Sequence, residues 1–195
     1  MTKKISVIVG SLRRESVARK IANNVAKMFS DEFEVSFVEI GNLPIYNCDY
    51  DDPKADWAPV PAEYDALRSA IKSSDGVLIV TAENNRLVPA CVKNVVDICS
   101  KPAGDSAWKG LPAAIISHSV GRMGGFSSHK SLKLALSYFA MPMVPQPEVF
   151  LGNSHDLFKD ADGNMGDTIT NESTVEFLRG YVGQFEQLVR DNPRD

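Results

Sequence analysis

Two hydroxyls and two arginines stand together in GSLRRES, Gly10 to Ser16, between a β-branched run and a segment with helical spacing. The amino terminus of a helix offers unpaired N–H groups and the positive end of its dipole, which suits a phosphate dianion. Ser11 and Ser16 could donate hydroxyl hydrogen bonds to it, and Arg13 could add a charge-assisted contact. The alternative is a Ser-capped helix beside solvent-exposed arginines. The glycine patterns of nucleoside-triphosphate and dinucleotide sites are both missing.

A second stretch, SHSVGRMGG from Ser117 to Gly125, has three glycines in its last five residues, directly after an apolar run. Glycine permits positive φ and lets a flat ligand approach the backbone closely. A flexible strand-to-helix connection is the alternative interpretation. A lone histidine at the end of a strand is more often structural than functional, so His118 is left out of the predicted site.

A third stretch, TAENNRLVPACVKN from Thr81 to Asn94, follows the buried-strand pattern DGVLIV. Two adjacent asparagines and a segment that begins with proline and has helical spacing come directly after this strand. We expect a loop here that presents its backbone to a ligand.

Several other functions lack their sequence signals. No Gly-x-Ser-x-Gly nucleophile turn is present, and the three histidines have no metal-ligand spacing, so we expect neither a serine hydrolase nor a metal site. The net charge of −4 and the lack of basic runs with interleaved aromatics argue against nucleic acid. No apolar run approaches the ~18 residues of a membrane span, so no membrane association is expected. Three cysteines without a Cys-x-x-Cys pair and an amino terminus without a signal-peptide pattern predict reduced thiols and a cytoplasmic location.

Strand-like and helix-like segments alternate along the chain. Strands are predicted at 4–10, 34–40, 76–80, 112–119 and 142–152, the last interrupted by prolines and therefore placed at a sheet edge. Helices are predicted at 17–29, 61–75, from 89 onward, at 126–139 and from about 173, where Ser173 and Glu176 could form a capping box.

Five strand–helix units in series predict a single α/β domain over 1–195. Its fold class would be a flavodoxin-like, doubly wound, five-stranded parallel sheet of order 2-1-3-4-5 with helices on both faces. Ligands of such folds bind at the carboxyl ends of the strands, where the strand order reverses. The three stretches described above follow strands one, three and four, so they should form one site.

Together these loops resemble those of the NADPH-dependent FMN reductase family, which includes chromate and quinone reductases and related azoreductases. The resemblance covers most of the chain. It extends to LPIYNCDYDD after the second strand, VPACVKNVVD in the third helix, SAWKGLPAAII before the fourth strand and PQPEVFLGN in the fifth.

The resemblance carries over unevenly at the residues. The hydroxyls and the arginine of the first loop match, and so do Glu83 and Asn85, but Ala18 replaces a usual asparagine. In the loop after strand three, Ala82 and Asn84 stand where the family has proline and tyrosine. The cofactor-binding residues implied by the resemblance are Ser11, Arg13, Ser16, Val17, Ala18, Ala82, Glu83, Asn84, Asn85, Ser117, Gly121 and Gly124.

The resemblance implies an FMN-dependent NAD(P)H oxidoreductase with an altered flavin-ring loop. It would transfer hydride from NADPH or NADH through FMN to a small-molecule acceptor: a quinone, azo dye, nitro compound or oxyanion. It also implies a homodimer or homotetramer, and no catalytic protein side chain is predicted. The alternatives are a flavodoxin-like electron carrier and a degenerate relative with weak or no flavin binding that acts as a binding or interaction module.

Overall fold

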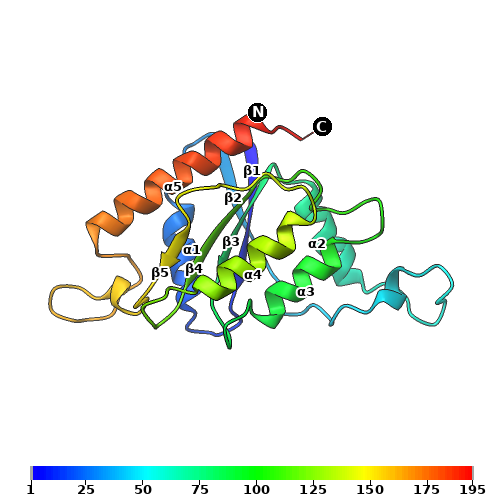
Figure 1. The fold of residues 1–195 in the computed structure, drawn as a ribbon, viewed down its shortest axis with the longest axis horizontal. Coiled ribbons are helices and arrows are strands. Elements are labelled where there is room, and N and C mark those ends of the chain that lie inside the picture. Colours follow the sequence, from blue (N-terminus) through cyan, green and yellow to red (C-terminus); the bar gives the residue numbers. More distant parts are fainter. Residues whose placement is uncertain (1, 195) are drawn as a thin grey trace.

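A parallel five-stranded sheet organises the chain in the computed structural model, which describes residues 2–194 (Figure 1). The ends of the predicted 1–195 domain, residues 1 and 195, lie outside the described part. The strand order β2-β1-β3-β4-β5 confirms the predicted topology. The strands are β1 Lys3–Gly10, β2 Phe33–Val38, β3 Gly76–Thr81, β4 Ala113–His118 and β5 Val149–Leu151.

Helices cover both faces of the sheet, as predicted (Figure 1). One core joins the sheet to α1 and α5, and a second core joins its other face to α2, α3 and α4. Strands β1, β3 and β4 are almost entirely buried, as expected for parallel strands covered on both sides. The helices are α1 Val17–Ala26, α2 Ala62–Lys72, α3 Ala90–Cys99, α4 Phe126–Ser137 and α5 Glu172–Asp191, with short 3-10 turns η1 Cys48–Asp51 and η2 Asp156–Phe158.

The fifth strand lies at the sheet edge, as predicted, but it is much shorter than the proline-rich segment 142–152. Its three residues pair only with the last three of β4, from Ile116 on. The backbone of Ile115 is completed by a side chain instead. The hydroxyl of Tyr181 on α5 accepts from the Ile115 N–H at 2.9 Å and donates to its carbonyl at 3.0 Å. A helix thus supplies the hydrogen bonds of a missing strand residue.

The predicted capping box of the last helix is wrong. Helix α5 begins at Glu172, and its cap is Asn171, whose side chain accepts the N–H of Thr174 at 2.9 Å. The Ser173 hydroxyl donates to the same Asn171 oxygen. An asparagine two residues earlier therefore takes the capping position that Ser173 could have filled, since both residue types cap well.

The long connection between β2 and α2 is fixed to the second core by a buried ion pair. Arg68 Nη2 lies 2.7 Å from Asp51 Oδ2, both side chains are 8% exposed, and Arg68 Nε donates to the Ile98 carbonyl.

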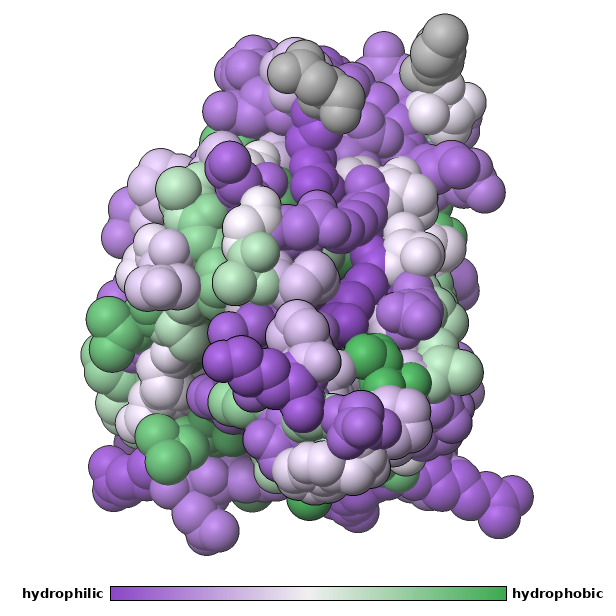
Figure 2. Space-filling model, turned by 90° about the vertical axis from the view of Figure 1, so that its right-hand side faces the viewer, coloured by the Kyte–Doolittle hydropathy of each residue, from purple (hydrophilic) through white to green (hydrophobic). Residues whose placement is uncertain are grey.

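Figure 2 shows the side of the molecule with this connection as mostly hydrophilic, with apolar residues in small separate groups. Within residues 2–194, no helix has the length and apolar character needed to cross a bilayer.

Candidate functional site

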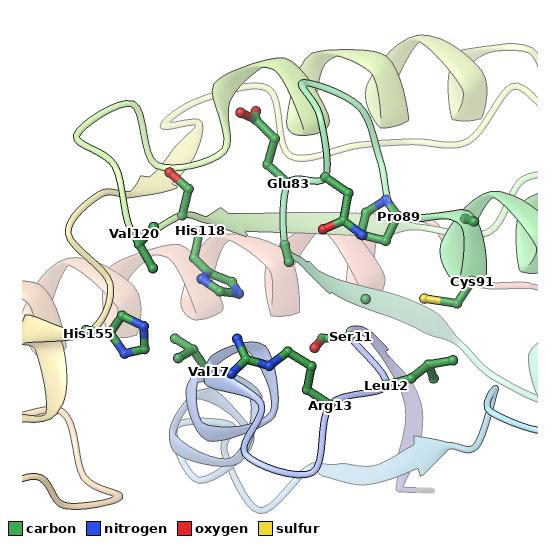
Figure 3. A pocket seen from close by; sticks show the side chains of 15 residues that line it. Ser11, Leu12, Arg13, Val17, Glu83, Pro89, Cys91, His118, Val120 and His155 are labelled. Carbon is green, nitrogen blue, oxygen red and sulfur yellow. The ribbon is translucent and has the colours of Figure 1, made fainter.

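The carboxyl ends of β1, β3 and β4 open into one cavity of about 660 Å³ (Figure 3). This volume is within the range of ligand pockets. All three stretches singled out in the sequence contribute to its walls, together with the start of α3 and one residue beyond β5. The lining residues are Gly10, Ser11, Leu12, Arg13, Val17, Ala82, Glu83, Asn84, Pro89, Ala90, Cys91, His118, Ser119, Val120 and His155.

The loop after β1 leaves its backbone free. Among the described residues, the N–H groups of 11–15 donate no hydrogen bond within the protein. Ser11 and Arg13 line the cavity with Val17, the first residue of α1. Free N–H groups, a hydroxyl, a guanidinium and the positive end of a helix dipole together form a surface suited to a phosphate dianion.

Two predicted residues of this loop have structural positions. Ser16 is 4% exposed and caps α1, its Oγ accepting the Arg19 N–H at 3.1 Å. Ala18 is fully buried in the core between α1 and the sheet. Neither lines the cavity, so the Ser-capped helix that competed with the phosphate interpretation describes Ser16 correctly, while Ser11 and Arg13 face the cavity.

The loop after β3 closes on itself. Asn84 and Leu87 exchange two backbone hydrogen bonds of 3.0 Å each, and the residues between them, Asn85 and Arg86, have φ of 51° and 67°. Two positive φ values inside such a pair are the pattern of a type I′ turn. Ala82, Glu83 and Asn84 line the cavity, whereas Asn85 lies outside it at the turn.

Glu83 anchors this loop to helix α4. Its Oε2 accepts the Ser128 N–H at 3.0 Å in the first turn of that helix, and the Ser128 hydroxyl donates to the Ala82 carbonyl at 2.8 Å. The cap residue of α4 is Gly125, which has no side chain to cap with. A carboxylate at this position satisfies a free N–H and the helix dipole together. Glu83 therefore holds the cavity wall in place.

The glycines after β4 shape the loop by packing. Gly124 has φ +60°, and a Cβ there would lie 2.5 Å from the Phe150 carbonyl carbon. The Ser117 hydroxyl donates to the Gly124 carbonyl at 2.8 Å. Ser117, Gly121 and Gly124 are not among the residues that line the cavity, so their contact with a ligand stays a prediction.

His118, left out of the predicted site, lines the cavity. It is 7% exposed, its Nδ1 lies 3.0 Å from the Ser154 hydroxyl, and its buried Nε2 has no hydrogen-bond partner in the described part of the chain. Burial lowers its pKa to about 4, with a smaller contribution from nearby His155, so the imidazole is neutral near pH 7. His118 lies two residues after Ile116, and residues two apart on a strand share a face, so this spacing could have placed His118 on the α1 face of the sheet.

Leu12, Pro89, Cys91 and His155 were also outside the predicted set and line the cavity. Cys91 is half-buried, and burial raises the pKa of its thiol. Within residues 2–194, no group of three or more His, Cys, Asp or Glu is arranged to hold a metal ion. The cavity fits a phosphorylated molecule, because it joins an open N–H surface to a wall that includes apolar Leu12, Val17 and Ala82.

Comparison with known proteins gives matches over nearly the whole chain. Residues 3–156 match the NADPH-dependent FMN reductase family. A quinone reductase of Pseudomonas putida KT2440 is 40% identical over 188 residues, covering 96% of this chain and 95% of the relative. A 2-hydroxy-1,4-benzoquinone reductase of a Burkholderia species is 38% identical over 192 residues, covering 98% of each.

Solved structures agree in fold. FerB, a flavoenzyme NAD(P)H:(acceptor) oxidoreductase from Paracoccus denitrificans, superimposes with a TM-score of 0.86 at 33% identity, over 99% of this chain and all of that one. A mutant flavodoxin from Pseudomonas aeruginosa gives 0.58 at 16% identity, over 94% of this chain and 99% of that one, and so shares the fold alone.

Proposed function

Since the chain belongs to the NADPH-dependent FMN reductase family, we propose that it is a quinone reductase, transferring hydride from NADPH or NADH by way of bound FMN to small quinones. It is an oxidoreductase with FMN as cofactor and NAD(P)H as co-substrate. The FMN supplies the redox chemistry when bound. The protein's own residues would bind, orient and shield the cofactor.

The loop after β1 carries this proposal. It meets the cavity with the N–H groups of 11–15, which are unpaired among residues 2–194, the Ser11 hydroxyl and the Arg13 guanidinium, all beside the start of α1. These groups would hold the FMN phosphate. Two similar proteins of 38–40% identity are named for quinone reduction, which supports quinones as the acceptor class. Azo dyes, nitro compounds and oxyanions are further acceptors to test.

The isoalloxazine ring would lie between the loop after β3 and the start of α3. Ala82 and Asn84 line this part of the cavity with Pro89, Ala90 and Cys91. The residue types give an altered flavin-ring loop, because no aromatic side chain of that loop can stack on the ring. A lost aromatic contact costs ~0.5–1.5 kcal/mol beyond its buried area. We therefore expect weaker FMN binding than a tyrosine at 84 would give.

The test is a titration of dialysed protein with FMN, followed by flavin fluorescence, then anaerobic NADPH and finally a benzoquinone. Binding, bleaching by NADPH and recovery of the oxidised spectrum with the quinone are expected. Binding without bleaching would favour an electron carrier instead. No binding at saturating FMN would favour a binding or interaction module and overturn the proposal.

Two broader features are part of the same proposal. The cysteines Cys48, Cys91 and Cys99 are free thiols, which supports a reducing, cytoplasmic location. A homodimer or homotetramer is supported by large apolar side chains at the surface, of which Tyr138 is 86% and Leu134 76% exposed on or beside α4. Sedimentation of the purified protein measures the oligomeric state.

A further inference from the structure

A buried histidine faces the loop after β1 from the opposite wall of the cavity. His118 closes β4 and lies on the same face of the sheet as Ile116, which belongs to the core shared with α1. In Figure 3 its imidazole points from β4 into the cavity, toward Val17 and Arg13, and His155 stands beside it. A group from β4 thus meets the start of α1 across the cavity.

The Nε2 atom of His118 is a hydrogen-bonding group that finds no partner among the described residues. The side chain is 93% buried, and the only hydrogen bond of the ring within residues 2–194 is between Nδ1 and the Ser154 hydroxyl at 3.0 Å. Ser154 is itself fully buried, and within residues 2–194 its hydroxyl has no other hydrogen-bond partner. Leaving a buried polar atom unpaired is costly, so such an atom in a native cavity calls for an explanation.

The Ser154 contact favours one tautomer. A serine hydroxyl can donate to Nδ1 or accept from it, but within residues 2–194 the buried Ser154 hydroxyl has no other acceptor for its own proton, so donation to Nδ1 is the arrangement that leaves this proton paired. When the Ser154 hydroxyl donates to Nδ1, the ring proton is on Nε2 and points into the cavity. Burial keeps the pKa of His118 at about 4, so this donor is neutral near pH 7.

We infer that His118 binds the phosphate monoester of FMN, donating its Nε2–H to a phosphate oxygen from the wall opposite Ser11 and Arg13. His155, which is exposed at the cavity rim, would add a weaker contact. This inference rests on the proposed function and deepens it, because it makes the end of β4 part of the discrimination between phosphorylated and unphosphorylated flavin. Ser154 then acts as a positioning residue for the His118 ring.

Two substitutions separate a donor role from a packing role. The amide of His118→Asn can replace Nδ1 beside Ser154 but does not reach the place of Nε2. The longer His118→Gln can place an N–H near Nε2. His129→Asn is the matched control, because His129 is 3% exposed on α4, also has a ring nitrogen (Nδ1) without a partner among residues 2–194, and lies outside the cavity wall.

The measurement is the affinity of each dialysed variant for FMN and for riboflavin by fluorescence quenching. His118→Asn should lower the ratio of FMN to riboflavin affinity by about 10- to 100-fold, the range for a hydrogen bond to a charged group. His118→Gln should recover most of it, and His129→Asn should leave it unchanged. Riboflavin binding shows in each case that the variant is folded.

Three outcomes would overturn the inference. One is an unchanged ratio in His118→Asn, and another is an equal loss in the Asn and Gln variants, which would assign His118 to packing. The third is an unchanged flavin ratio with altered discrimination of NADPH from NADH in anaerobic flavin reduction. That result would assign the phosphate donor to the nicotinamide co-substrate. If wild-type protein bound neither flavin, the proposed function itself would fail.

Discussion

The loops after β1 and β3 leave neighbouring strands, paired at Gly10 and Thr81, and enter the same cavity, yet their backbones are used in opposite ways. In the first loop the N–H groups of 11–15 donate to no acceptor in the described part of the chain. In the second loop the N–H of Asn84 donates to the Leu87 carbonyl and the N–H of Leu87 donates to the Asn84 carbonyl, and Glu83 anchors the loop to α4. The first loop is therefore prepared to bind an anion, and the second is prepared to keep its shape. Affinity should come mainly from the first.

Removing the cation from the open loop should have the largest effect. Arg13→Ala should weaken FMN binding by ~1.5–3 kcal/mol, the value of a charge-assisted hydrogen bond, and leave riboflavin binding unchanged. Flavin fluorescence titrations with both ligands measure this. Arg14→Ala is the control, since Arg14 is exposed, adjacent, and outside the cavity wall. Equal losses of FMN and riboflavin affinity would contradict the assignment of the phosphate site to this loop.

Restoring the family's residues to the closed loop should strengthen binding less than Arg13→Ala weakens it. Asn84→Tyr with Ala82→Pro should tighten FMN about tenfold through a stacked ring and a stiffer free loop. Within residues 2–194 the Ala82 N–H makes no hydrogen bond, so proline removes none. Titration of the double and both single variants separates the contributions. Unchanged affinity in the double variant would contradict the placement of the ring.

Removing the contact that anchors the closed loop to α4 should lower the stability of the fold. Glu83→Ala removes the carboxylate that accepts the Ser128 N–H at the start of α4, at a cost of about 1 kcal/mol for a helix cap. In a chain of this size the Tm should fall by about 2–4 °C, measured by circular dichroism. Glu34→Gln, at an exposed position of β2, controls for the loss of charge. An equal Tm for Glu83→Ala and wild type would mean that the loop keeps its shape without Glu83.

The smallest effect is expected at the turn itself. Arg86 has φ of 67°, a conformation that costs a residue with a side chain about 1 kcal/mol and costs glycine almost nothing. Arg86→Gly creates the Asn-Gly pair favoured in type I′ turns and should raise Tm slightly. Lys27→Gly, where φ is −77°, should lower it. A lower Tm in Arg86→Gly would contradict the closed turn.

The element order and strand order could be predicted because periodicity records which faces are buried. In α5, Leu178, Tyr181 and Phe185 are buried as their spacing predicts. Boundaries were less accessible, because several residues near a helix start can cap it, and Asn171 rather than Ser173 does so. The fifth strand also shortened where prolines remove N–H donors.

The candidate site was likewise predictable from the sequence only in part. A serine before a helix has one hydroxyl that suits either a cap or a ligand, and sequence alone does not decide between them at Ser16. His118 depends on contacts that are distant in sequence, above all Ser154, 36 residues later. The closed turn after β3 was hidden because Asn85 and Arg86 adopt a conformation usually signalled by glycine.

The hydroxyl of Tyr181, which holds both backbone groups of Ile115, makes one amide of the sheet depend on a helix. In native-state hydrogen exchange, the Ile115 amide should be protected only while α5 is docked, since no strand residue replaces that contact. The amides of neighbouring β4 residues that pair with β5 or β3 should exchange only when the sheet itself opens. The exchange rate of the single Ile115 amide would therefore report how often the last helix undocks.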